Sequence, residues 1–169
     1  MIDAPLAIKT LLLSSQVNLP GSVVKTNGLP ALLTSKFTAG GTFPNNTSQR
    51  VYVGHLVPGF DPSYGPGVVL RVGSGASGGT GGGSAHPEIP LLMPRVQITT
   101  WAGVNQYIDA REVYRTIFDF IQGLNMVDLG TDVGFILSCT EQVEAQDVDD
   151  IHTGFATTIS FWKFMLRAY

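Results

Sequence analysis

The sequence predicts an α+β fold in which two helices pack on a mainly antiparallel sheet. Residues 105–124 carry apolar side chains at three- and four-residue steps, which is the period of an amphipathic helix. Two runs near the end of the chain, 133–146 and 153–166, are long and rich in strand-forming residues. Shorter strand patterns occur in the middle of the chain, before residue 105. The expected order is therefore helix, extended arm, three strands, helix and two strands, in a single domain spanning 1–169.

The first helix is expected from residue 3 to about residue 16. Asp3 can accept hydrogen bonds from the free amides of the first turn, and Pro5 is tolerated there. This helix is mostly apolar, so the rest of the fold must cover it. Residues 18–50 then hold several Gly and Pro and a polar run, and this composition indicates a long extended arm or insertion.

Three strands are expected in the middle of the chain, at 50–57, 67–72 and 95–101. The segment FDPSYGPG between the first two consists of turn-forming residues. The third, RVQITTW, alternates in the manner of a half-buried strand. The glycine-rich run GSGASGGTGGGS begins a loop over 73–93 that is expected to be flexible, because glycine and serine restrict the backbone little.

The helix over 105–124 has the clearest pattern in the chain. Asn105 is expected to cap it. Glu112 and Arg115 are spaced as a helical ion pair, which contributes about 0.3 kcal/mol when exposed.

The last strand has large apolar side chains on both faces. Such a strand needs cover on both sides. We expect the helix to cover one side and a neighbouring subunit to cover the other. The two sets are Phe155, Ile159 and Phe161 on one face, and Trp162, Phe164 and Leu166 on the other.

The composition favours an ordered chain that assembles. Hydrophobic residues make up 44% of the chain, which argues against disorder. Charged residues make up only 14%, and a subunit that hides surface against other subunits needs fewer of them. The net charge of −3 gives no basic footprint for nucleic-acid binding.

The charges are unevenly spread along the chain. Residues 1–100 carry six Lys or Arg and three Asp or Glu, whereas residues 101–169 carry four and ten. If the two halves map to different faces, copies of the chain could attract one another head to side. The alternative, that folding mixes these charges in space, stays open at this point.

The chain has one cysteine, so an intramolecular disulfide is impossible and a reducing compartment is expected. We recognise no signal peptide, and no apolar run approaches the roughly 20 residues of a membrane span. We therefore expect no membrane partner.

Two catalytic patterns occur within the glycine-rich run. Gly73, Gly75 and Gly78 match G-x-G-x-x-G, which requires a helix starting at the third glycine to hold a pyrophosphate. Ser77 lies in G-x-S-x-G, the nucleophile elbow, which also requires a following helix. No helix pattern follows, so both matches are interpreted as chance. A triad would have to draw on His86 or His152 with Asp149 or Asp150.

Other reactive residues also favour a structural role. Asp147, Asp149, Asp150 and His152 lack the Gly and the final Glu of a calcium loop, and they are interpreted as a solvated turn. Cys139 lies mid-strand and is expected in the core. We predict no catalytic residues, no metal and no cofactor, and therefore no enzyme. Neither His55 nor His86 has an evident partner, and Trp101 and Trp162 are expected to be core or interface anchors.

Four stretches in the C-terminal part of the chain follow one another in a fixed order. They are PRVQITTWAG (94–103), the amphipathic helix ending near GLN (123–125), GFILSCTEQVEAQD (134–147) and IHTGFATTISFWKF (151–164). In pattern and order they resemble the tail-terminator proteins of tailed bacteriophages, which complete the tail and join it to the head. RVYVGHLVP resembles that family's first strand. Residues 18–50 and the glycine-rich run depart from the family pattern.

The resemblance implies a small α+β subunit that forms a ring, usually a hexamer. Such a ring caps the tail tube, stops its polymerisation and presents a surface to the head–tail connector or stopper protein. DNA would pass through the lumen without specific binding, and the protein, made in the host cytoplasm, would lie in the neck of the virion. Interface residues expected on this basis are Gly73, Gly75, Gly78, Gly82, Ser84, Glu112, Arg115, Trp162 and Phe164.

Two alternatives remain open. The chain could be another neck component, such as a stopper or connector, or a tail-tube-like subunit. A remote alternative is a small hydrolase that uses Ser77. In the leading hypothesis the glycine-rich loop lines the lumen or reaches an adjacent ring, so deleting 75–82 should weaken assembly and leave the fold intact.

Overall fold

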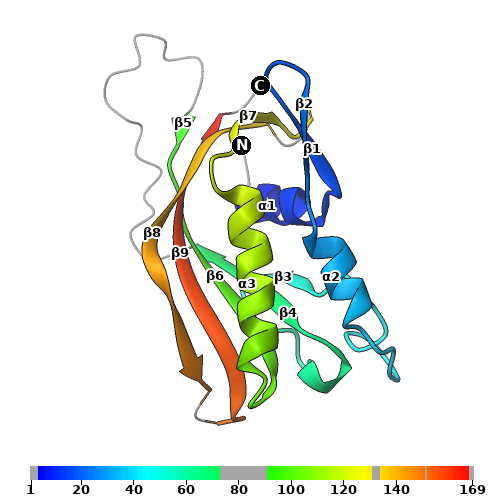
Figure 1. The fold of residues 1–169 in the computed structure, drawn as a ribbon. Helices are drawn as coiled ribbons and strands as arrows, with labels where there is room; N and C mark the ends of the chain where they lie inside the picture. The colour runs from blue at the N-terminus through cyan, green and yellow to red at the C-terminus, as the bar shows by residue number, and fades with distance from the viewer. Residues whose placement is uncertain (1–3, 73–90, 131–133, 151, 168–169) are drawn as a thin grey trace.

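A computed structural model describes residues 4–72, 91–130, 134–150 and 152–167 of the chain. Three α-helices, a curled seven-stranded sheet and a two-stranded sheet make up this part, which confirms the α+β class (Figure 1). In chain order the elements are α1 (Ala4–Leu13), β1 (Gln16–Leu19), β2 (Val23–Thr26), α2 (Leu29–Ser35), β3 (Val51–Val53), the 3-10 helix η1 (Pro62–Tyr64), β4 (Gly67–Val72), β5 (Leu91–Leu92), β6 (Arg95–Val104), α3 (Tyr107–Ile121), β7 (Asn125–Asp128), β8 (Phe135–Asp149) and β9 (Phe155–Arg167).

The large sheet has the strand order β3-β4-β6-β9-β8-β7, and the short β5 pairs with the end of β9. β3 and β4 run parallel, whereas the other paired strands run antiparallel. The register of the long β8–β9 pair shifts at three places, and such bulges bend a strand. In Figure 1 both strands curve around α3.

The core lies between one face of this sheet and the helices, and we call this face the inner face. The side chains of Val113, Ile117 and Ile121 on α3 are fully buried there. The buried stripe of α1 covers the part of the inner face formed by β3 and β4. We call the opposite face of the sheet the outer face.

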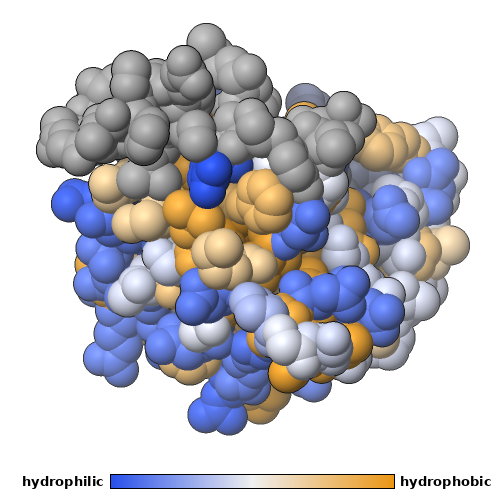
Figure 2. Space-filling view, turned by 90° about the horizontal axis from the view of Figure 1, so that it is seen from above, coloured by the Kyte–Doolittle hydropathy of each residue, from blue (hydrophilic) through white to orange (hydrophobic). Residues whose placement is uncertain are grey.

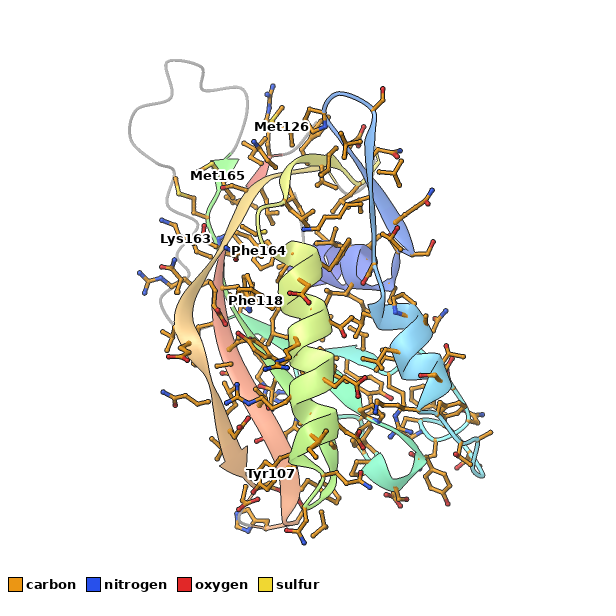
Figure 3. All side chains as sticks on the ribbon, viewed as in Figure 1. Tyr107, Phe118, Met126, Lys163, Phe164 and Met165 are labelled. Carbon is orange, nitrogen blue, oxygen red and sulfur yellow. The ribbon has the colours of Figure 1, made fainter. Side chains whose placement is uncertain are left out.

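Side chains of β9 alternate between these two faces, as the pleat of a strand requires. Trp162 and Phe164 are 0% exposed and point into the core. Figure 3 shows Phe164 on the side of β9 that faces Phe118 of α3, and Lys163 and Met165 on the other side. The expectation that the helix covers one face of this strand is confirmed.

The extended arm predicted over 18–50 is partly wrong. β2 and α2 lie within it, and only the stretch after Lys36 has no helix or strand until β3. Leu29 and Leu33 of α2 are buried in the core, and tertiary burial of this kind stabilises a helix too short to form alone. Asn27 connects α1 to α2: its amide donates to the carbonyls of Leu12 and Ser14, and its Oδ1 accepts from Leu29 N–H.

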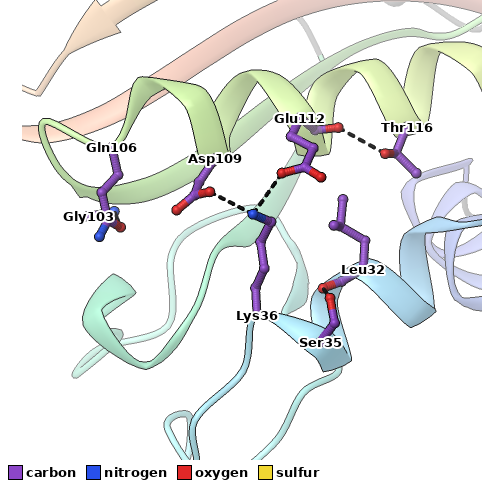
Figure 4. Close-up of polar contacts among 8 residues, drawn as sticks. All are labelled: Leu32, Ser35, Lys36, Gly103, Gln106, Asp109, Glu112 and Thr116. Atoms are coloured by element: carbon purple, nitrogen blue, oxygen red, sulfur yellow. Dashed lines mark hydrogen bonds and ion pairs between the residues drawn. The ribbon is translucent and has the colours of Figure 1, made fainter.

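The ion pair predicted between Glu112 and Arg115 is also wrong. Lys36 Nζ lies 2.7 Å from Asp109 Oδ1 and 2.7 Å from Glu112 Oε2, and so it occupies both carboxylates (Figure 4). These hydrogen bonds raise the pKa of Lys36. Because Lys36 directly follows α2, the contact fixes the end of α2 against α3. Sequence spacing within one helix could not reveal a partner that is distant in the chain.

The observed ends of several helices and strands differ from the predicted ones. Asn105 does not cap α3, because its φ is +61° and the cap position belongs to Gln106, whose Oε1 accepts from Gly103 N–H. The helix ends at Ile121, and β7 follows where the sequence predicted no strand. The strand predicted at 50–57 is confined to β3, and Gly54 after it has a φ of +88°. β8 continues to Asp149, past the expected end at 146. Asp3, the expected cap of α1, lies outside the described residues.

Candidate functional site

The outer face is formed by rows of side chains that run across β4, β6, β9 and β8. One row contains Val69, Thr99, Ile159 and Gln146, which are successive cross-strand partners. The next row contains Arg71, Gln97, Phe161 and Val143, in the same relation. Directly paired residues project from the same side of a sheet. The outer face therefore combines apolar, polar and basic side chains.

Apolar groups on this face are open to solvent in the described part of the chain. Phe161 is 37% exposed, and its neighbour Val143 is also exposed. Ile159 and Met165 are half-buried. Large apolar side chains grouped on one face are a common feature of protein interaction sites. The outer face of β9 has the apolar character that the sequence predicted.

A shallow hollow of about 360 Å³ lies on the outer face near the β8–β9 turn. Thr99, Thr157 and Ile159 contribute to its lining from the middle of the sheet. Arg71 lines it too, and Arg71 Nε donates to Gly54 O. The lining also includes Trp101, whose Nε1 is buried without a hydrogen-bond partner in the described structure. The hollow is thus partly apolar and contains one unused donor.

The acidic turn predicted at 147–152 borders this hollow through Asp149, Asp150 and His152. The hydroxyl of Thr153 donates to Asp150, and this bond lowers the pKa of Asp150. Asp149 accepts a hydrogen bond from the hydroxyl of Tyr107. The described residues contain no group of three or more His, Cys, Asp or Glu that could hold a metal ion. The carboxylates of Asp149 and Asp150 thus both accept hydrogen bonds from hydroxyl groups of the same chain.

One stripe of α3 binds the carboxylates of β8. Tyr107 contacts Asp149, Arg111 Nε lies 2.7 Å from Asp147 Oδ2, and Tyr114 Oη donates to Glu141 Oε1 at 2.8 Å. These helix residues are spaced by four and three positions, so they lie on one side of α3. Burial, the bond to Glu141 and the nearby charge of Glu144 raise the pKa of Tyr114. Sequence reasoning missed this contact set, although the helical spacing of Tyr107, Arg111 and Tyr114 is visible in the sequence.

The end of the molecule that carries β7 and the β1–β2 hairpin is shown in Figure 2. Apolar surface is exposed there between hydrophilic margins. The exposed apolar side chains of these elements are Val23 and Val24 of β2 and Met126 of β7. β2 pairs with β1 alone in the described structure, so its other edge has no strand partner. This end is a second, smaller candidate contact surface.

The predicted interface residues are not brought together. Trp162 and Phe164 are fully buried in the core of the chain, so they cannot contact a partner directly, and this part of the prediction is corrected. Their apolar size reflects packing under α3. Glu112 is exposed and pairs with Lys36, while Arg115 is exposed on α3 next to Asp119. Gly73, Gly75, Gly78, Gly82 and Ser84 lie outside the described residues, as do Ser77 and His86.

Cys139 and His55 have different environments. Cys139 is buried, its thiol faces the carbonyl of Ile121, and burial raises its pKa to about 11. Such a thiol is a poor nucleophile near neutral pH. His55 is exposed just after β3.

No protein-family model matches the chain, and no curated protein matches its sequence. In the described part of the chain, none of the helices has the length and apolar character that crossing a membrane requires.

Proposed function

We propose that the chain is a structural subunit of a phage virion that assembles into a ring at the head-proximal end of the tail. The ring would terminate polymerisation of the tail-tube protein and join the tail to the head–tail connector or stopper. DNA would pass through its lumen without specific binding. A hexamer is the ring size that the resemblance implies, and the chain would act without catalysis or a cofactor.

The observation that carries this proposal is the two-sided character of β9. Its inner side is buried in the core beneath α3, while its outer side presents Phe161, which is 37% exposed, and the half-buried Met165. A subunit that is buried against its neighbours in a ring has this pattern. The segment order β6, α3, β8 and β9 also matches the stretches on which the resemblance to tail terminators rests.

The proposal is tested by adding the purified chain to polymerising tail-tube subunits of the same virus. We expect shorter tubes, each with a ring at one end in electron micrographs, and tube length that decreases as the chain is added in excess. Bovine serum albumin at equal mass is the control. Tubes of unchanged length without end density would refute the function.

The same images distinguish the alternatives. Open filaments formed by the chain alone would favour a tail-tube-like subunit. Rings that bind isolated connectors but leave tube length unchanged would favour a stopper.

A further inference from the structure

The basic residues of the large sheet lie on its outer face. The strands β4, β6 and β9 contain four basic residues and no Asp or Glu. All four project from the outer face, because their neighbours Val96, Trp162, Phe164 and Leu166 and the β4 residue Leu70 are in the core. All four are exposed, and none forms an ion pair with a described acidic residue. They are Arg71, Arg95, Lys163 and Arg167.

The basic residues lie close to one another across the strands. Arg95 and Lys163 are directly paired in the β6–β9 register. Arg71 pairs with Gln97, which lies two residues along β6 from Arg95. Exposed Phe161 lies two residues from Lys163 on the same side of β9. The basic groups thus border an apolar centre.

The surface formed by α3 and β8 carries more acidic than basic residues. β8 carries four acidic residues and no basic one, and α3 carries three acidic and two basic residues. Glu141 and Asp147 are the cross-strand partners of Trp162 and Thr158, which places them on the α3 side of β8. Glu144 follows the outer-face residue Val143, so the pleat of the strand turns it toward α3, where its charge raises the pKa of Tyr114. Ile108, which is 83% exposed, supplies a protruding apolar group on the same helix.

β8 is also a free edge along this acidic stretch. β7 pairs with β8 only as far as Ser138, and no other described strand pairs with this edge of β8 after Ser138. Acidic side chains on a free edge discourage pairing with another strand. The same acidic side chains make the α3–β8 surface suited to a basic partner.

We propose that the outer face of one copy of this chain binds the α3–β8 surface of the next copy, with Arg95 and Lys163 opposite Glu144 and Asp119. A contact between two different surfaces of one chain is heterologous, and repeating it produces rings or filaments. A two-fold contact through the outer face would instead place basic groups against basic groups. The inference rests on the proposed ring and names the surfaces that build it.

A second copy explains the outer face better than nucleic acid does. The basic groups surround exposed apolar side chains, Phe161 and Val143, which a phosphate backbone would leave unused. The chain itself supplies the complementary acidic surface, including Glu144 and Asp119, which form no ion pair with a described basic residue. The attraction should weaken with salt, because surface charges are screened beyond roughly 10 Å at about 0.1 M ionic strength.

Sedimentation velocity on charge-reversal variants tests the contact. The basic-side variant is Arg95→Glu with Lys163→Glu, and the acidic-side variant is Asp119→Lys with Glu144→Lys. All four positions are exposed, so both variants should keep the wild-type circular dichroism and melting temperature. Wild type should self-associate at low ionic strength, and each variant alone should sediment as a monomer at least tenfold above the wild-type midpoint concentration.

Mixing the two variants should restore assembly, because each then offers the surface that the other lost. Lys9→Glu, on α1 away from both surfaces, is the control and should assemble as wild type does. The contact is overturned by a monomeric wild type, by variants that still assemble, or by a mixture that stays monomeric. It is also overturned if the basic-side variant loses only binding to a labelled DNA duplex while its self-association is unchanged.

The tail-tube assay separates this inference from the function on which it rests. Charge-reversal variants that still form rings on tube ends would refute the contact and leave the function standing. If the chain assembles through this contact but does not change tube length, the proposed function is refuted and the contact stands.

Discussion

The rings of Phe118 on α3 and Trp162 on β9 pack with centroids 5.9 Å apart and an angle of 58° between their planes. Trp162 is fully buried, and its Nε1 donates to Ser160 Oγ at 2.9 Å. This pair joins α3 to β9, an inner strand of the large sheet, and so contributes to the packing of α3 on the sheet.

Replacing Trp162 with Ala should therefore lower the free energy of unfolding by about 3–5 kcal/mol, because it leaves a large cavity under α3. Urea unfolding followed by circular dichroism measures the change. Phe161→Ala is the matched control on the same strand. Its side chain faces outward, so the loss should be much smaller. Equal losses for the two variants would contradict the assignment of the faces.

Asn27→Ala should destabilise the fold more than its position outside any helix or strand suggests. The Asn27 side chain is nearly fully buried and bonds to Leu12 O, Ser14 O and Leu29 N–H. Leaving such groups without partners costs about 1–3 kcal/mol. Asn18→Ala, at an exposed position on β1, is the control and should change stability little. Thermal melts of both variants decide the point, and similar melting temperatures would count against the connecting role of Asn27.

Lys36→Met should lower stability by about 0.2–1 kcal/mol at neutral pH, because the contact with Asp109 and Glu112 is partly exposed. The two carboxylates raise the pKa of Lys36 above its usual 10.5. The stabilisation is therefore fully present below pH 10.5 and is lost as the pH rises through the higher pKa of the folded state. The difference between wild type and variant, measured by urea unfolding, should shrink above that pH and in high salt. A difference that grows with pH would exclude the ion pair as its cause.

Cys139 should resist thiol reagents in the folded protein. Its pKa of about 11 leaves about one thiol in a thousand ionised at pH 8, and the side chain is buried. Labelling with Ellman's reagent should be slow in native buffer and fast in concentrated urea, with one thiol per chain. Fast labelling of the native protein would show that the β8 side of the core opens readily.

Much of the fold follows from periodicity in the sequence. The spacing of Ala110, Val113 and Ile117 identifies α3, because it repeats with the period of a helix. The many Thr, Ile, Phe and Trp residues around Trp162 identify β9, because these residues favour strands. The buried position of Cys139 follows from its place in a strand. α2 and β7 were missed, because seven- and four-residue elements give too few repeats for a period to be recognised.

The candidate contact surfaces were less predictable than the fold. Trp162 and Phe164 were expected at an interface, yet size and apolarity alone do not tell which side of a two-sided strand meets the chain's own helix. The absence of acidic residues from β4, β6 and β9 is readable in the sequence. That the basic residues of these strands share one face can be seen only from the cross-strand register.

The α+β class, the amphipathic helix and the long closing strands can be predicted without the structure, because they depend on local features, namely the helical period of apolar side chains and the strand preference of single residues. The pairing of Lys36 with Glu112 and the gathering of the basic residues of β4, β6 and β9 on one face become visible in the folded chain alone. These relations join residues far apart in the chain. They depend on strand order, register and the side of the sheet on which α3 packs, and no local pattern contains that information.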